Sequence, residues 1–288
     1  MEQPDGSHTW SDTYGRMVNR NLGLLDERQQ QRLKGSCVAL CGLGGIGGPI
    51  SEILCRLGVG SFKLLDHGAF EPTNANRQIF CFTDTDGRMK TDVTEEYLRR
   101  INPEVRTEKY VEITEENVEP FLEGVDVAVL SIDSAIPCLI LGRATRHRGI
   151  PLVEGWAAAF GNVRVFTSDT PSLEEVYGFP TVGREISSVS EEEAGLLMMQ
   201  SLRTFASQIP EVGTYYEDSD WQRLQEKNEG TTICPCVWLT CVLMANETMK
   251  ILLDWGKLAL APTFAVYDPF AHQIPAQRVP RDEDSEHG

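Results

Sequence analysis

The sequence predicts an α/β protein built on a doubly wound, mostly parallel sheet. Short apolar segments alternate with amphipathic helical segments, and residues 125–131 are almost entirely apolar. Strands joined by helices run parallel, and a strand covered by helices on both faces is apolar throughout. No such alternation is visible between residues 168 and 232, which predicts a long inserted cap or crossover segment.

The expected elements follow one another along the first half of the chain. Strands are expected at residues 37–40, 61–66, 105–111, 125–131 and 151–154. Helices are expected at 93–101, at 136–147 and after residue 48, where Ile50, Ile53, Leu54 and Leu57 repeat with helical spacing. Pro49 suits the first turn of that helix, and Gly58 ends it. Residues 162–167 and 264–267 are expected as further strands of undetermined direction.

Five parts are expected along the chain. Their bounds are a helical arm (1–34) with an amphipathic stretch at 22–33, a nucleotide-binding core (35–167), an insertion (168–233), a closing helix and strand (234–280) and an acidic tail (281–288). The insertion contains a helix candidate at 191–209 and aromatic residues expected to be exposed, namely Tyr215, Tyr216 and Trp221. Helical periodicity returns at residues 237–253.

Composition restricts the class of partner and the compartment. A net charge of −17 argues against DNA or RNA, which require clustered basic residues. We expect that no apolar run approaches the roughly 20 residues of a membrane span, and residues 1–8 lack a signal-peptide core. Most of the eight cysteines lie in apolar patterns, where a free thiol packs as a small hydrophobe. We therefore expect a cytoplasmic protein that binds neither DNA nor a membrane.

Glycines are concentrated where the first strand ends. Gly42, Gly44, Gly45 and Gly47 separate an apolar strand from a helix, and Asp66 follows about twenty residues later, at the end of the second strand. Such a turn presents backbone N–H groups and a helix N-terminus to phosphate, and the carboxylate suits ribose hydroxyls. The alternative is that the glycines only allow a tight turn and bind no phosphate. The pattern predicts a Rossmann-like nucleotide site without distinguishing NAD from ATP.

Three charged residues favour a nucleotide whose phosphates react. Arg77 can donate to two phosphate oxygens, Lys90 supplies a point charge, and Asp133 at a strand end can hold Mg²⁺. Together they suit attack at an α-phosphate, because they neutralise charge on the reacting phosphate and on departing pyrophosphate. Taken singly, Lys90 is equally consistent with an ordinary solvated lysine. For Asp133 taken singly, the alternative role is a strand-end cap.

Six motifs carry a resemblance to a known family. They are residues 42–47 (Gly-Leu-Gly-Gly-Ile-Gly), Asp66, 71–78 (Glu-Pro-Thr-Asn-Ala-Asn-Arg-Gln), 87–90 (Gly-Arg-Met-Lys), 101–103 (Ile-Asn-Pro) and 132–134 (Ile-Asp-Ser). In order and spacing the chain resembles the ThiF/MoeB/HesA family of ubiquitin-activating-enzyme-like adenylyltransferases. The resemblance covers residues 14–167, with a weaker echo at 240–253.

The resemblance implies ATP binding, Mg²⁺, and adenylation of a substrate carboxylate with release of pyrophosphate. By position, Gly44 and Gly47 face phosphate, Asp66 binds ribose, and Asp133 is the Mg²⁺ ligand. The residues implied to surround the phosphates are Asn74, Arg77, Gln78 and Lys90. An N-terminal arginine of the family reaches the neighbouring subunit's ATP; Arg16 matches it, with Arg20 as a competitor, so a homodimer is implied.

The chain also departs from the family pattern. Gly68 stands where many members have a second aspartate, and the first Cys-x-x-Cys pair of a structural zinc site is absent. Cys234 and Cys236 alone cannot fill a tetrahedral site, so zinc is not expected. Residues 168–233 contain no cysteine, which argues against a thioester-forming nucleophile there. Two interpretations of Cys234 and Cys236 remain: one of them is catalytic, or both are packed thiols without a chemical role.

The main hypothesis is a homodimeric, Mg²⁺-dependent adenylyltransferase. Its carboxylate substrate is the C-terminus of a ubiquitin-like or sulfur-carrier protein, or a peptide or small-molecule acid; the departures favour the second group. The alternatives are an adenylation-driven dehydratase or cyclase of the same family and an NAD(P)-binding oxidoreductase. A catalytically inactive partner subunit is disfavoured because Arg77, Lys90 and Asp133 are all present.

Overall fold

The computed structural model describes residues 10–227 and 230–278, and the acidic tail predicted at 281–288 lies outside them. Within these residues the core is a seven-stranded sheet of order β3-β2-β1-β4-β5-β6-β7. The strands are β1 (Cys37–Cys41), β2 (Ser61–Leu65), β3 (Arg106–Tyr110), β4 (Val127–Leu130), β5 (Leu152–Glu154), β6 (Gly161–Phe166) and β7 (Ala265–Tyr267).

Strands β1 to β5 are parallel, and β6 and β7 are added antiparallel to their neighbours. The strand directions that the sequence pattern left open are thus opposite to β1–β5 for β6 and the same as β1–β5 for β7. The chain order reverses on either side of β1, which is the arrangement of a doubly wound Rossmann-like sheet. The predicted fold class is confirmed.

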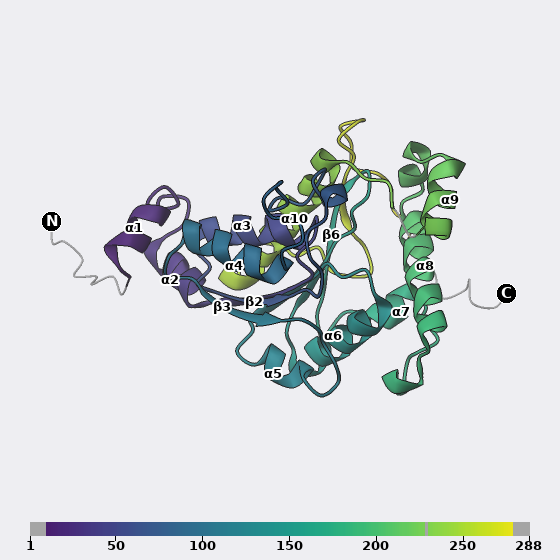
Figure 1. Cartoon of the computed structure of the whole chain (residues 1–288), viewed down its shortest axis with the longest axis horizontal. Helices are drawn as coiled ribbons and strands as arrows, with labels where there is room; N and C mark the ends of the chain where they lie inside the picture. Colours follow the sequence, from purple (N-terminus) through teal and green to yellow (C-terminus); the bar gives the residue numbers. More distant parts are fainter. Residues whose placement is uncertain (1–9, 228–229, 279–288) are drawn as a thin grey trace.

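Helices cover both faces of the sheet (Figure 1). They are α1 (Asp12–Val18), α2 (Glu27–Gly35), α3 (Gly47–Leu57), α4 (Lys90–Ile101), α5 (Val118–Leu122), α6 (Ala135–Arg148), α7 (Leu173–Tyr177), α8 (Glu191–Gln208), α9 (Asp218–Lys227) and α10 (Cys234–Leu253). One apolar core joins α2, α3, α4 and α10 to the sheet, and a second joins α5 to α8 to the opposite face. The strands are therefore covered on both sides, as their apolar sequences require.

Helix α10 corrects one sequence-based prediction. By length and composition its 20 residues would suffice to cross a membrane, contrary to our expectation that no segment approaches this. In the fold, α10 packs against β6 and α3, so its apolar residues have a core to fill. Trp238 and Val242 are the large apolar side chains that it leaves partly exposed.

The N-terminal arm packs at the far end of α3. The predicted amphipathic stretch 22–33 is helical only from Glu27, because Asp26 caps α2 in a capping box with Gln29. Tyr14 of α1 is buried and donates its hydroxyl hydrogen bond to the carbonyl of Gly58, 2.6 Å away. Gly58 is the C-cap of α3, with φ of 104°, as the sequence predicts.

Residues 168–227 and 230–233, called the crossover segment below, stand beyond the end of the sheet opposite to α1 (Figure 1). Helix α8 agrees with the predicted helix and begins after Ser190, whose side chain accepts a hydrogen bond from the Glu193 N–H. The aromatic residues expected to be exposed are only partly so. Tyr215 is 42% exposed, whereas Tyr216 and Trp221 are half-buried and contact each other.

Candidate functional site

One row of paired residues crosses the carboxyl edge of the sheet. Leu65 pairs with Cys41, Cys41 with Leu130, and Leu130 with Glu154. The residues that follow this row are Asp66 after β2, the glycine turn after β1, Asp133 after β4 and Trp156 after β5. Neighbouring strands lie about 4.8 Å apart, so these groups are side by side. In open α/β sheets, ligands bind at this edge where the strand order reverses.

The glycine turn is packed too tightly for side chains. A Cβ on Gly47 would lie 1.8 Å from the carbonyl oxygen of Gly42, and a Cβ on Gly42 would lie 2.4 Å from the carbonyl oxygen of Ser131. Gly42 also has φ of 96°, which favours glycine. The turn leads directly into α3, whose N-terminus has no side-chain cap. It therefore presents unpaired helix N–H groups, which suit an anion.

Asp66 connects the second strand to this turn. Its carboxylate accepts hydrogen bonds from the backbone N–H groups of Leu43 and Gly68, each at 2.7 Å. It therefore fixes the entrance to the glycine turn in addition to the ribose contact that the sequence predicts. The Nζ atom of Lys90 is 3.2 Å from the position of a Cβ on Gly68, so Lys90 lies beside Asp66. Lys90 makes no ion pair with any residue that the structure describes.

Because Gly68 carries no carboxylate, Lys90 finds no acidic partner at this position. A substitution of Gly68 tests the effect. In Gly68→Asp, the new carboxylate would pair with Lys90 and repel Asp66. We expect the affinity for Mg-ATP to fall about tenfold, the equivalent of one moderately buried charge pair. Isothermal titration calorimetry measures this, with the equally large but uncharged Gly68→Asn as the control. Equal affinities for the two variants would contradict the charge-based explanation.

Arg77 and Gln78 lie against the glycine turn. The side chain of Arg77 passes 3.2 Å from a Cβ position on Gly45, and its Nη1 donates to Asn76 Oδ1 at 2.7 Å. Gln78 is buried beside Gly44, and its Oε1 atom has no hydrogen-bond partner. A buried polar atom without a partner is costly, so this acceptor fits a place where a ligand donates.

The other predicted site residues differ in position. Asn74 accepts a hydrogen bond from the Glu71 N–H and so shapes the loop that holds Arg77. Asp133 is exposed in the loop that follows β4, and β4 is the strand next to β1. Arg16 is exposed on α1, next to the C-terminal end of α3, whereas the glycine turn is at the N-terminal end. Within one chain, Arg16 is therefore not brought together with the other residues.

Sequence reasoning missed three sets of contacts at this site. The indole N–H of Trp238 on α10 donates to the carbonyl of Arg77 at 2.9 Å, and Asn76 donates to the carbonyl of Thr232. Both contacts tie the Arg77 loop to the start of α10. The Ser131 hydroxyl lies 2.9 and 2.8 Å from the carbonyl oxygens of Cys41 and Gly42, which ties the glycine turn to β4. No sequence signal announces these pairings, because they join distant segments.

The cysteines near the site are not activated. Burial raises the pKa of Cys234 and of Cys236, and no positive group offsets it. A thiol with a raised pKa is a poor nucleophile at neutral pH. All eight cysteines are free thiols. In the part of the chain that the structure describes, no three His, Cys, Asp or Glu side chains cluster as metal ligands.

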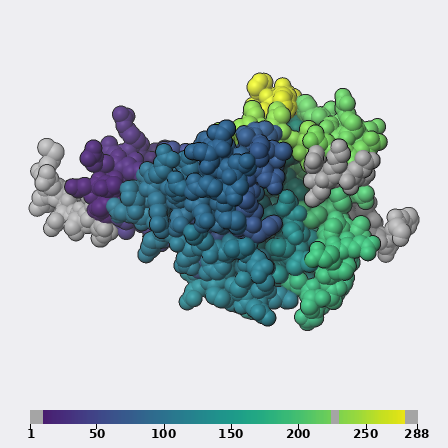
Figure 2. Space-filling view, in the orientation of Figure 1, coloured from purple at the N-terminus to yellow at the C-terminus, as the bar shows by residue number. Residues whose placement is uncertain are grey.

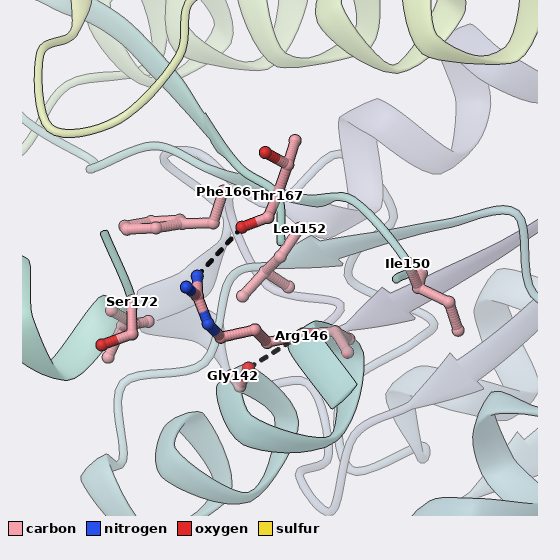
Figure 3. Close-up of a pocket in the computed structure, with 9 residues that line it drawn as sticks. Gly142, Arg146, Ile150, Leu152, Phe166, Thr167 and Ser172 are labelled. Carbon is pink, nitrogen blue, oxygen red and sulfur yellow. Dashed lines mark hydrogen bonds between the residues drawn. The ribbon is translucent and has the colours of Figure 1, made fainter. Parts of the chain in front are cut away.

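The surface is hollowed at the carboxyl edge. Figure 2 shows a recess between the blue surface near residue 75 and the green surface of the crossover segment. A separate cavity of about 10 Å³ lies at the opposite edge, between α6, the start of β5 and the end of β6. There Arg146 donates to the carbonyl of Thr167 at 3.1 Å (Figure 3). That volume holds about one water molecule, so this second cavity is no nucleotide site.

The fold and the carboxyl edge together define a protein of the Rossmann-like α/β class. Residues 18–287 match the model of the ThiF family. The chain is 31% identical to the SAMP-activating enzyme E1 of Haloferax volcanii over 265 residues, which are 90% of this chain and 82% of that protein. The chain therefore belongs to the ThiF family, and the predicted resemblance is confirmed.

Other relatives match over shorter regions. The tRNA threonylcarbamoyladenosine dehydratase of Escherichia coli is 32% identical over 50% of this chain and 54% of its own length. The sulfur carrier protein adenylyltransferase of Thermus thermophilus is 34% identical over 49% of this chain and 53% of its own length. The chain thus spans about half the length of these two curated relatives.

Solved structures support the fold over nearly the whole chain. PaaA superposes with a TM-score of 0.67 at 17% identity, over 97% of this chain and 78% of that one. Escherichia coli MccB with ATP superposes with a TM-score of 0.64 at 18% identity, over 95% and 73%. At these identities the likeness concerns the architecture, including the crossover segment.

Proposed function

We propose that this chain binds ATP at the carboxyl edge of its sheet and activates a substrate carboxylate as an acyl adenylate. The observation that carries the proposal is the row of strand ends, which aligns Asp66, the glycine turn and Asp133 in adjacent positions. Two cations, Arg77 and Lys90, lie beside that row without an ion pair to any described residue. Along the row, Asp66 suits the ribose, the glycine turn with its two neighbouring cations suits the phosphates, and Asp133 suits the metal.

The reaction follows from these groups. An oxygen of the substrate carboxylate attacks the α-phosphorus, and the bond between that phosphorus and the oxygen bridging to the β-phosphate breaks. Pyrophosphate leaves with the electron pair. Arg77 and Lys90 neutralise the negative charge that develops on the phosphates, and the N-terminus of α3 adds its N–H groups. Asp66 holds the ribose and so fixes the position of the α-phosphate.

Magnesium fits this donor set. Mg²⁺ in nucleotide sites is commonly held by one or two carboxylates together with phosphates and water, so the single exposed carboxylate of Asp133 suffices. The ion would supply further neutralisation of phosphate charge. We propose Asp133 as its protein ligand.

The substrate class is part of the proposal. Relatives named for SAMP activation and for sulfur-carrier adenylylation suggest the C-terminus of a small carrier protein. A peptide or small-molecule acid is the other option, which the weak nucleophilicity of Cys234 and Cys236 favours. An adenylation-driven dehydratase is a second candidate, because one relative bears that name. We propose the cytoplasm as the compartment, consistent with eight free thiols.

We further propose a homodimer in which Arg16 serves the neighbouring subunit's ATP. Arg16 is exposed, and Tyr14, two residues before it, anchors α1 firmly to Gly58. Arg16→Ala and Lys90→Ala proteins should each be inactive alone. Mixed subunits should regain up to about a quarter of wild-type exchange activity, because some dimers then contain one intact site. Arg20→Ala is the matched control and should stay active. Absence of activity in the mixture would contradict the trans arrangement.

Nucleotide choice tests the proposal first. Mg-ATP should raise the unfolding temperature of the protein and NAD should not, because only ATP presents three phosphates to Arg77 and Lys90. Differential scanning calorimetry at saturating nucleotide measures both shifts. Stabilisation by NAD without stabilisation by Mg-ATP would favour the oxidoreductase alternative and overturn the proposal.

A further inference from the structure

The last position in the row of strand ends has no role in nucleotide binding. Asp66, the glycine turn and Asp133 occupy the ends of β2, β1 and β4, and Trp156 follows the end of β5, one strand beyond Asp133. A substrate carboxylate must approach the α-phosphate from outside the nucleotide. The end of β5 is the next place along the edge, on the side of the crossover segment.

Trp156 is held there by a buried hydrogen-bond network. Its indole N–H donates to the Tyr177 hydroxyl at 2.8 Å, and Tyr177 donates to Glu154 Oε1 at 2.8 Å. Burial raises the pKa of Tyr177 well above its usual range, so the hydroxyl keeps the proton that it donates. Glu154 Oε2 accepts from Arg164 Nε at 2.6 Å, and the Arg164 side chain is completely buried.

The network is an unusual way to fill a core. The guanidinium of Arg164 lies 4.2 to 4.9 Å from the ring centres of Phe166, Tyr177 and Phe264, and its Nη2 has no hydrogen-bond partner. Burying an ion pair costs desolvation that apolar residues of similar volume avoid. The pair therefore contributes little net stability, and what it does provide is a fixed orientation of Tyr177 and, through it, of Trp156.

The loop that carries Trp156 contains no charged residue. Residues 155–161 read Gly-Trp-Ala-Ala-Ala-Phe-Gly, and Trp156 also stacks on Phe205 of α8 at 5.9 Å. The Asn162 side chain fixes the loop by bonding the backbone N–H and carbonyl of Trp156. Trp156 is half-buried and Ala157 is exposed, so apolar groups are accessible at the end of β5.

We propose that Trp156 forms the wall of the acyl subsite, and that this subsite selects substrates with an apolar or aromatic group next to the activated carboxyl. Tyr177 is a positioning residue that acts through Trp156. The inference rests on the proposed function, since only an adenylating enzyme has an acyl group at this place. A glycine-ended substrate would leave the indole surface uncovered.

Stable acyl-adenylate mimics test this directly. The probes are 5′-O-sulfamoyladenosine and its glycyl and phenylalanyl derivatives, and calorimetry measures their dissociation constants. In the wild type, the phenylalanyl mimic should bind about tenfold more tightly than the glycyl mimic, as expected for one ring packed on an indole. Trp156→Ala should abolish this preference and leave the affinity for sulfamoyladenosine unchanged. Trp156→Phe should restore part of the preference.

Two further variants separate positioning from folding. Tyr177→Phe keeps the ring but removes the acceptor for the indole N–H; it should lower the preference about threefold and shift the Trp156 fluorescence. Trp255→Ala, at an exposed tryptophan beyond α10, should leave the preference unchanged. A preference that persists in Trp156→Ala, or a wild type that prefers the glycyl mimic, overturns the subsite. Failure of the wild type to bind sulfamoyladenosine at all would overturn the proposed function itself.

Discussion

Replacing Lys90 by alanine should lower the rate of ATP–pyrophosphate exchange by about 10²- to 10³-fold. The Lys90 ammonium lies beside Asp66 and Gly68 and makes no ion pair with a described residue, so its charge is available to phosphate. Removing one preorganised group that stabilises developing charge typically costs this much in rate. Mg-ATP should also bind more weakly, since the ground state carries negative charge at the same place.

Steady-state exchange and calorimetric titration of Mg-ATP measure the two effects. Lys90→Arg keeps the charge and should retain more activity than Lys90→Ala. Lys257→Ala is the matched control, because Lys257 is exposed beyond the C-terminal end of α10. An unchanged exchange rate in Lys90→Ala would show that Lys90 is an ordinary surface lysine.

Gly47→Ala should abolish nucleotide binding and destabilise the fold. Its Cβ would lie 1.8 Å from the carbonyl oxygen of Gly42, which is a backbone atom. Because the Cβ position is fixed by the backbone of residue 47, neither atom can move aside without opening the turn. Forced overpacking of this kind costs about 1–3 kcal/mol. The loss of the turn geometry removes the N–H groups that face phosphate, so binding should fall below detection.

Urea unfolding and titration of Mg-ATP measure both parts of this prediction. The matched control is Gly195→Ala in α8, where a Cβ meets no atom within 4 Å. That change should stabilise the protein by about 0.5–1 kcal/mol, because alanine is a better helix former than glycine. If Gly47→Ala bound Mg-ATP as the wild type does, the glycine turn would not be the phosphate site.

Locally encoded features were predictable from the sequence. The strand, the glycine turn and α3 are contiguous, and Gly58 and Ser190 mark helix ends by backbone requirements that hold in any fold. Asp66 was predictable because its distance from the turn is set by one βαβ unit. The parallel direction of β1 to β5 followed from the same alternation.

Features that join distant segments were not predictable. Trp156, Tyr177 and Arg164 come together only because β6 turns back antiparallel to β5 and α7 packs over both. From the sequence alone, Arg164 would be assigned to the surface, because it is charged and lies in an expected strand of undetermined direction. Helix α10 contacts the sheet and the glycine turn at once, and its contact with the turn also joins segments that are distant in the sequence.

The central claim is that this chain transfers AMP from ATP to a carboxylate. The most direct measurement is isotope exchange between pyrophosphate and ATP across a panel of peptides with a free C-terminal carboxyl, each paired with its C-terminal amide. The account predicts Mg²⁺-dependent exchange with at least the peptides that end in an apolar residue, and none with any amide. Equal exchange with acids and amides, or release of ADP and phosphate in place of pyrophosphate, would contradict it.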